Sequence, residues 1–284
     1  MKLSTKLLIG LAITMFVVPT LIASYLVRIT RIDTNVYHAN IEKEVTSADA
    51  KDIYFKSFPT AQFDKLHILG ANANGLNVYL VKSERFLIKV SKDQADYVRT
   101  KVNADGYLTV EFLAGSDQYY KPIYIFSPDL KVLKLKKASV NEFSAQLDEL
   151  TIEGDSIEAF SLDGKSAINT LNLKLTNSII DNFGSPDRDA SAATLPVNHL
   201  FVDVTNTSLG LPGLSYESAS ILARNSEVYF SKRAPVAKVN TLNIKTEGMT
   251  SVRLDSLQWG TLQGNLSNDT KIDLPVHALR TLIK

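Results

Sequence analysis

Residues 168–173 read INTLNL, a pattern of an apolar residue, any two residues, Leu, any residue and a second apolar residue. Side chains of a β-strand alternate between its two faces, so such a segment gives a strand one apolar face. The pattern recurs through the second half of the chain, with weaker copies around Ile221 and Leu257. The central leucines of the clear copies are Leu133, Leu150, Leu171, Leu200 and Leu242.

Repeated strands of this kind are typical of a solenoid. The central leucines are mostly on the order of 20 residues apart, with longer gaps where residues 182–194 and 209–218 look like inserted loops. One such strand cannot bury its apolar face alone, whereas stacked copies form a continuous interior. We therefore expect an all-β fold, a right-handed parallel β-helix over residues 63–284, and a β-sandwich of hairpins is the alternative. Residues between the apolar positions should face water, among them Asn172, Lys174, Asp203, Asn243 and Lys245.

The N-terminal segment contains an uncharged run that begins at Leu7 and ends at Val27. A helix over residues 7–27 crosses about 30 Å of hydrocarbon. The apolar stretch of a cleaved signal peptide is shorter, about 7 to 15 residues, and ends in a small-x-small site that is not evident before Arg28. The run predicts an uncleaved signal anchor, one transmembrane helix within residues 1–31, with a cleaved signal peptide as the alternative. A long domain after such an anchor is normally translocated, and residues 32–62 are predicted to be a polar stalk with a short helix near 41–45.

Composition excludes several classes of protein. Thirty-one Lys and Arg against 30 Asp and Glu give a net charge of +1, so no bulk field favours nucleic acid. The chain has no Cys, and therefore no disulfide, thiolate metal site or cysteine nucleophile. Its four His residues are scattered, and the fingerprints of phosphate loops, dinucleotide folds and serine hydrolases are missing from the sequence. The sequence predicts no catalytic residue, no metal ligand and no cofactor.

Residues 63–143 contain short β-type segments separated by turn residues, at 66–69, 77–81, 86–90, 107–112 and 123–126. This region resembles the head GIN domain family, a domain of unknown function associated with candidate autotransporter adhesins of Gram-negative bacteria. The resemblance implies a β-helical, extracytoplasmic domain and carries over no catalytic residue. The matching segments are Phe63-x-x-Leu66-x-Ile68, Asn77-Val78-Tyr79-Leu80, Phe86-Leu87-Ile88-Lys89-Val90, Tyr97-Val98-x-Thr100-Lys101-Val102, Asp105-Gly106-Tyr107-Leu108-Thr109-Val110 and Ile123-Tyr124-Ile125-Phe126-Ser127-Pro128-Asp129-Leu130.

Four groups of residues are candidates for contact with a ligand. Tyr119 and Tyr120 end a loop, where aromatic rings stack on sugars or pack over the end of a fold. A second loop, long for a solenoid connection, carries Asp187, Arg188 and Asp189, which could grip a sugar or a protein partner. An acidic group could hold Ca²⁺, act in catalysis or form a solvated face. A basic run could bind anionic glycans or lipid headgroups, or form a charged strand face. These two groups are Asp148, Glu149, Glu153, Asp155, Glu158 and Asp163, and Lys131, Lys134, Lys136 and Lys137.

The leading functional hypothesis is a membrane-anchored, adhesin-like binding or scaffolding module without catalytic activity. It would be a single-pass protein of a Gram-negative cell envelope, with its C-terminal domain periplasmic or extracellular. Its partners would be the membrane, through residues 7–27, and a protein or a cell-surface glycan, but not nucleic acid. The alternatives are a structural subunit of a larger membrane complex and a polysaccharide-cleaving β-helix enzyme.

Overall fold

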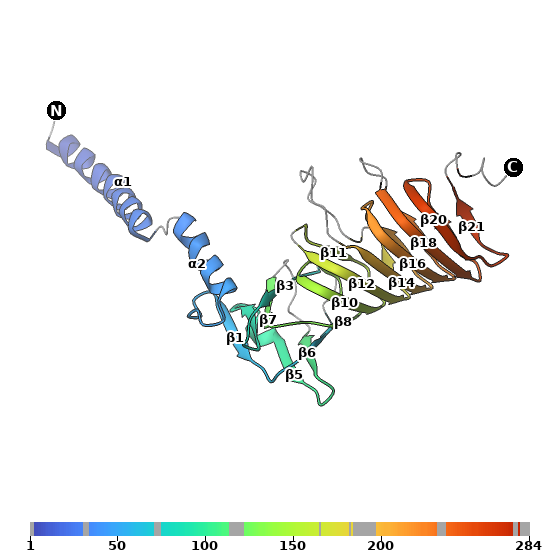
Figure 1. Cartoon of the computed structure of the whole chain (residues 1–284). Helices are drawn as coiled ribbons and strands as arrows, with labels where there is room; N and C mark the ends of the chain where they lie inside the picture. The colour runs from blue at the N-terminus through green and yellow to red at the C-terminus, as the bar shows by residue number, and fades with distance from the viewer. Residues whose placement is uncertain are drawn as a thin grey trace. The chain divides into compact units, whose positions relative to one another are not determined.

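A computed structural model describes residues 3–30, 34–70, 75–113, 122–164, 166–181, 183, 197–231, 237–274 and 278. The chain divides into two units, Met1–Ala50 and Lys51–Lys284 (Figure 1). The first unit is helical and the second is mostly β.

The first unit consists of α1 (Leu3–Thr30) and α2 (Thr34–Thr46). Within α1, Leu3–Leu26 has a mean hydropathy of 2.3 and is long enough to cross a bilayer. The hydroxyl of Thr20, which follows Pro19, donates a hydrogen bond to the Phe16 carbonyl at 2.6 Å. This polar group therefore has its hydrogen-bond partner within the helix. Such a helix suits either a membrane anchor or a signal sequence. The helix α2 is longer than the short helix predicted near residues 41–45.

The second unit contains all the strands that the structure describes. They are β1 (Phe55–Pro59), β2 (Lys65–Leu69), β3 (Leu76–Lys82), β4 (Leu87–Ser91), β5 (Val98–Val102), β6 (Tyr107–Phe112), β7 (Pro122–Ser127), β8 (Val132–Lys136), β9 (Val140–Ser144), β10 (Gln146–Asp155), β11 (Phe160–Leu162), β12 (Ala167–Thr176), β13 (Ile179–Ile180), β14 (His199–Thr205), β15 (Ser208–Leu211), β16 (Tyr216–Arg224), β17 (Glu227–Phe230), β18 (Ala237–Glu247), β19 (Ser251–Arg253), β20 (Leu257–Asn265) and β21 (Lys271–Asp273), with one 3-10 turn, η1 (Ala95–Tyr97). The segments predicted within residues 63–143 are confirmed as β2, β3, β4, β6 and β7. The strand β1 lies within the range 32–62 that the sequence assigns to a stalk.

The strands form three largely parallel sheets. The ten-stranded sheet has the order β20-β18-β16-β14-β12-β10-β8-β2-β6-β5, and the five-stranded sheet has the order β13-β15-β17-β19-β21. The six-stranded sheet has the order β1-β4-β7-β3-β9-β11. From β8 onward every pairing between described strands is parallel, which a succession of hairpins cannot produce.

The register of the ten-stranded sheet explains the repeated leucines. Leu150 lies beside Leu171, which lies beside Leu200, and all three are buried. The row continues through Ala219 to Leu242. These side chains belong to a single core cluster that extends from Phe63 to Leu257.

One repeat was aligned wrongly from the sequence. Leu133 lies beside Ile152, and not beside Leu150 as the shared pattern suggests. A shift of two residues leaves every side chain on its original face, so the apolar pattern cannot detect it.

The repeated strands β8, β10, β12, β14, β16 and β18 each end in a corner with left-handed backbone. The corner residues have φ between +47° and +65°, a region that Asn and Gly tolerate better than other residues. They are Lys137, Ser156, Asn177, Asn206, Asn225 and Gly248. The three asparagines each precede a buried hydroxyl residue, and a short strand of the five-stranded sheet follows.

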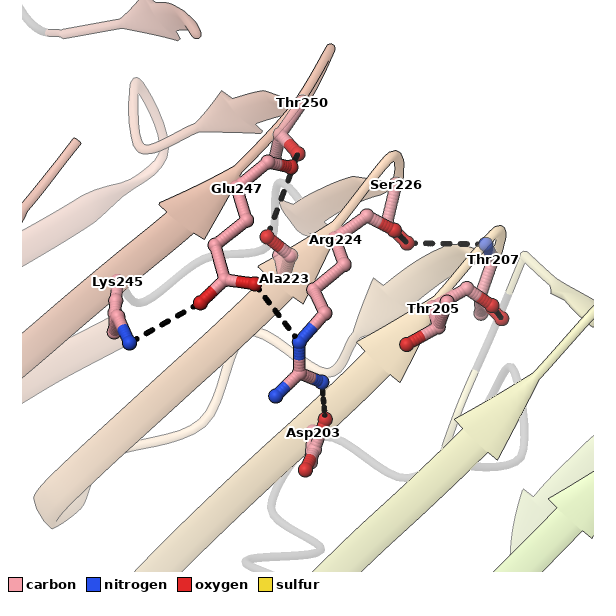
Figure 2. Close-up of polar contacts among 9 residues, drawn as sticks. All are labelled: Asp203, Thr205, Thr207, Ala223, Arg224, Ser226, Lys245, Glu247 and Thr250. Atoms are coloured by element: carbon pink, nitrogen blue, oxygen red, sulfur yellow. Dashed lines mark hydrogen bonds and ion pairs between the residues drawn. The ribbon is translucent and has the colours of Figure 1, made fainter. Parts of the chain in front are cut away.

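These buried hydroxyls, which we call the corner hydroxyl ladder, are Ser178, Thr207 and Ser226. The Thr207 hydroxyl accepts the Ser178 N–H at 3.3 Å. The Ser226 hydroxyl accepts the Thr207 N–H at 3.1 Å, as Figure 2 shows. Each hydroxyl also donates to the carbonyl two residues earlier, at 2.7 to 2.9 Å. The ladder thus satisfies backbone groups that the corners withdraw from the sheets.

Candidate functional site

Two of the four candidate groups, the five loop residues, lie outside the described residues. They are Tyr119, Tyr120, Asp187, Arg188 and Asp189.

The acidic group does not gather into one site. Asp148 and Glu149 begin β10, Glu153 and Asp155 end it, and Glu158 and Asp163 lie beyond it. Among the described residues there is no group of three or more His, Cys, Asp or Glu side chains placed to hold a metal ion.

Two of these carboxylates are bound by neighbours along the sheet. Glu153 forms an ion pair with Lys174 at 3.7 Å. A hydrogen bond from Asn177, together with those from Ser156 and Thr176, lowers the pKa of Asp155 below its usual value.

The basic run is also divided by the strand pleat and the corner. Lys131 pairs with Asp64 at 3.4 Å, whereas Lys134 and Lys136 lie on the exposed face of β8. Lys137 occupies a left-handed corner.

A groove of about 760 Å³ lies at the start of the repeated strands, and we call it the strand-start groove. It lies where β10 and β12 begin, beside the end of β3 and the loop between β7 and β8. Its lining consists of Lys82, Pro128, Asp129, Lys131, Gln146, Leu147, Asp148, Glu149, Ala167, Ile168, Asn169 and Asn198.

The groove presents many hydrogen-bonding groups on a small apolar base. Two ammonium groups, three carboxylates and three carboxamides line it, and Leu147 and Ile168 lie between them. The Asn198 amide donates to the Asn169 side-chain oxygen at 2.7 Å, and the Asn172 amide donates to Glu149 at 2.9 Å. These bonds fix carboxamides and carboxylates before any ligand arrives, so binding would cost less side-chain entropy.

Most of this groove was not predicted from the sequence, although the sequence contains a signal for it. In three copies of the repeat, the two residues between the first apolar residue and the central Leu are polar, with Asp148-Glu149, Asn169-Thr170 and Asn198-His199 in these places. The parallel register stacks these pairs at one end of the sheet. Lys82 and Asp129 come from the first half of the domain and share no such pattern.

A Ser, His and Glu triplet lies next to this region on the exposed face. His199 places Nδ1 at 2.9 Å from the Ser218 hydroxyl and Nε2 at 3.5 Å from a Glu217 oxygen. His199 and Ser218 are direct neighbours in the β14–β16 pairing. The backbone N–H groups of residues 217 and 218 both donate to the Asn198 carbonyl, so they are not free to stabilise an oxyanion.

A row of paired charges crosses the exposed face of β14, β16 and β18 (Figure 2). Arg224 contacts Asp203 at 2.5 Å and Glu247 at 3.2 Å, and Lys245 contacts Glu247 at 3.1 Å. The hydrogen bond to Asp203 and the Glu247 charge raise the pKa of the Arg224 guanidinium. The predicted outward positions of Asp203 and Lys245 are thus confirmed. Both charges form ion pairs with other residues of the same sheet, Arg224 and Glu247.

No protein-family model and no curated protein matches the chain. Among solved structures, it is similar to a candidate adhesin from Parabacteroides merdae ATCC 43184, with 15% identity, a TM-score of 0.46 and coverage of 77% of this chain and 94% of that chain. A candidate adhesin from Bacteroides fragilis NCTC 9343 has 13% identity, a TM-score of 0.41 and coverage of 77% and 95%. A candidate lipid binding protein from Parabacteroides distasonis ATCC 8503 has 13% identity, a TM-score of 0.38 and coverage of 77% and 95%. Likeness at this level assigns no ligand and no residue role.

Proposed function

We propose that this chain is a membrane-anchored, extracytoplasmic binding module that holds a polar, hydroxyl-rich ligand such as a cell-envelope glycan and does not transform it. The observation that carries the proposal is the strand-start groove, with its three carboxylates, two ammonium groups and three carboxamides. Sugar hydroxyls both donate and accept hydrogen bonds, and such a lining offers partners of both kinds.

The proposed scaffold is a right-handed parallel β-helix of the head GIN type. In its support, the three repeats β12–β13, β14–β15 and β16–β17 each pass from a long strand through a left-handed corner to a short strand, and both strands pair in parallel with those of the next repeat. Parallel connections within one sheet are almost always right-handed. Such a scaffold holds its outer side chains in fixed rows, which suits recognition without rearrangement.

The proposed location is the cell envelope, with α1 uncleaved in the membrane and residues 51–284 outside the cytoplasm. The 24-residue apolar span supports this placement. The long β domain that follows it would be translocated as a whole. N-terminal sequencing of the mature protein distinguishes an anchor from a cleaved signal.

Binding is tested with the full-length chain in detergent on an array of bacterial glycans, followed by calorimetry with the best ligand. We expect Asn198→Ala to weaken binding at least tenfold, because it removes a groove carboxamide and releases Asn169. The matched control is Asn243→Ala, an exposed Asn on the same sheet outside the groove. Equal affinities for the two variants, or no glycan bound by the wild-type chain, would refute the proposal.

The non-catalytic part of the proposal has its own test. The bound polysaccharide is incubated with the protein, and reducing ends and unsaturated products are measured over time. No increase over buffer is expected. Turnover that Ser218→Ala abolishes would instead make the His199 triplet an active site.

A further inference from the structure

The outer face of the ten-stranded sheet is strongly basic at the end formed by β8, β2, β6 and β5. These strands pair with one another in that order, so their outward residues share one continuous face. The only carboxylate that these four described strands place there is Glu111, on β6. We call this surface the basic face, and its cations are Lys65, Arg99, Lys101, Lys134 and Lys136.

The carboxylates that border the basic face are bound to other residues. Beside Lys134 lies Glu153, which forms an ion pair with Lys174 at 3.7 Å. Beside Lys136 lies Asp155, which accepts hydrogen bonds from three neighbouring side chains. The acidic groups nearest to these two lysines are therefore already engaged within the sheet.

Lys134 and Lys136 themselves have no such partners. No ion pair between described residues includes either of them. His67 lies beside Lys134, and its Nε2 atom is buried without a hydrogen-bond partner in the part of the chain that the structure describes. Burial and the charges of Lys134 and Lys136 lower the pKa of His67. Like charges therefore repel one another on the basic face, and a bound anion would relieve this repulsion.

Protection of a strand edge does not explain these two lysines. The edge strand is β5, where Arg99 and Lys101 are placed to prevent pairing with another chain. The strand β8 lies inside the sheet, between β10 and β2. Lys134 and Lys136 thus concentrate positive charge at a place where no edge needs protection.

A groove of about 530 Å³ begins at Lys134 and Lys136 and extends across β10, β12 and β14 to Arg224 on β16. We call it the cross-strand groove. The buried Leu135 and Leu175 belong to its lining, between two rows of outward side chains. Neighbouring strands are about 4.8 Å apart, so the five strands span about 19 Å. A groove of this length suits an extended chain molecule, whereas a flat membrane surface would not fill it.

We propose that the basic face and the cross-strand groove bind an acidic polysaccharide, a chain of sugars that carry carboxylates. Lys134 and Lys136 would bind the carboxylates through charge-assisted hydrogen bonds. Further along the groove, the hydroxyls of Thr176 and Thr205 would meet the hydroxyls of the sugars. This second site is distinct from the strand-start groove, because the two grooves lie at opposite ends of β10 and β12.

A nucleic acid, the other common linear polyanion, fits this surface less well. Proteins that bind single strands stack the bases on aromatic side chains. Tyr107 is the aromatic side chain that the four described strands place on the basic face, and the Lys65 ammonium lies over its ring at 5.2 Å from the centroid. That ring is therefore not open to a base on this side.

The test titrates the full-length chain in a non-ionic detergent with polygalacturonate at low salt and measures binding by calorimetry. The combined change Lys134→Gln and Lys136→Gln should weaken binding at least tenfold. The matched control combines Lys238→Gln and Lys271→Gln, which removes the same charge from exposed lysines elsewhere, and it should bind within about twofold of the wild type. In 1 M NaCl the wild-type affinity should fall at least tenfold because salt screens these contacts.

Equal affinities for the two double variants would overturn the proposal. Single-stranded DNA of equal charge should bind at least tenfold more weakly than polygalacturonate, and DNA that binds as tightly would contradict a polysaccharide site. Asn198→Ala, which alters only the strand-start groove, should leave polygalacturonate binding unchanged. A loss in that variant alone would assign the polymer to the strand-start groove and refute the second site, while the proposed function would stand.

The pKa of His67 gives a second measurement, by NMR of the histidine-labelled chain, with His67→Asn to assign the signal among four His residues. Saturating polygalacturonate should raise this pKa, because its carboxylates offset the neighbouring positive charges. The groups that face His67 across the sheet and along its own strand are Lys134, Lys136, Thr109, Glu111 and Lys65. An unchanged pKa in the saturated complex would show that the polymer binds elsewhere and would overturn the proposal.

Discussion

Replacement of Thr207 by Val tests the corner hydroxyl ladder. Thr207 is 3% exposed, and Val has nearly the same shape without the hydroxyl. The change removes the acceptor of the Ser178 N–H at 3.3 Å and the donor to the Thr205 carbonyl at 2.9 Å. The Thr205 carbonyl keeps a second donor, the Asn177 N–H at 3.1 Å. The main loss is therefore one buried N–H left without a partner.

A buried donor without a partner costs about 1–3 kcal/mol. The bond to Ser178 is longer than a typical N–H···O bond, which places the expected loss in the lower part of that range, about 1–2 kcal/mol. This corresponds to roughly a 5- to 30-fold smaller ratio of folded to unfolded protein.

The assay is urea unfolding of the full-length chain in detergent, followed by far-UV circular dichroism. The midpoint should fall for Thr207→Val and recover in large part for Thr207→Ser, which restores the hydroxyl. Thr241→Val makes the same chemical change on the exposed face and should change the free energy of unfolding by less than about 0.5 kcal/mol. If Thr207→Val and Thr241→Val are equally stable, the ladder does not stabilise the corners and the reasoning is wrong.

Three further outcomes follow from the geometry. Asn206→Ala should lower stability by about 1 kcal/mol because φ is +50° there, whereas Asn206→Gly should cost less; urea midpoints compare the two. Arg224→Met should lower the free energy of unfolding by about 0.5–1 kcal/mol at low salt and by less in 1 M NaCl, because salt screens exposed ion pairs. An equal loss at both salt concentrations would contradict this prediction. Burial and the charges of Lys134 and Lys136 lower the pKa of His67. Below about pH 6.5 the unfolded chain therefore binds a proton at His67 more readily than the folded chain does, and the free energy of unfolding should fall as the pH drops below that value. A His67→Asn variant whose free energy of unfolding falls equally over this pH range would refute the prediction.

The repeated strands could be predicted because burial imposes a regular pattern on them. Leu171, Leu200 and Leu242 occupy equivalent places in their repeats, and they lie in one buried row. The offset of Leu133 could not be predicted, since a shift by two residues preserves the pattern. The corners had a readable signal in Asn followed by Ser or Thr, which at Asn206 coincides with a glycosylation sequon.

The order of the strands in the first half of the domain could not be predicted from the pattern of apolar residues. The strand β2 lies between β8 and β6, although β6 and β8 are separated from it by several other strands along the chain. No repeated motif marks that insertion. The strand-start groove also combines both halves of the domain, since Lys82 ends β3 and Asp129 precedes β8, whereas other lining residues come from β10 and β12. The residues that line the groove are spread between Lys82 and Asn198, so no short segment of the sequence contains them all.

The stacking of short and long strands has an evolutionary consequence. Each repeat from β12 to β18 contacts the repeat before it and the one after it through the same register, and connecting segments of different lengths leave these rows intact. The segments that connect the repeats could therefore become longer, become shorter or be exchanged during evolution, while the strands of the sheets stay in register. Relatives with little shared sequence could then differ in what they recognise while keeping the same frame.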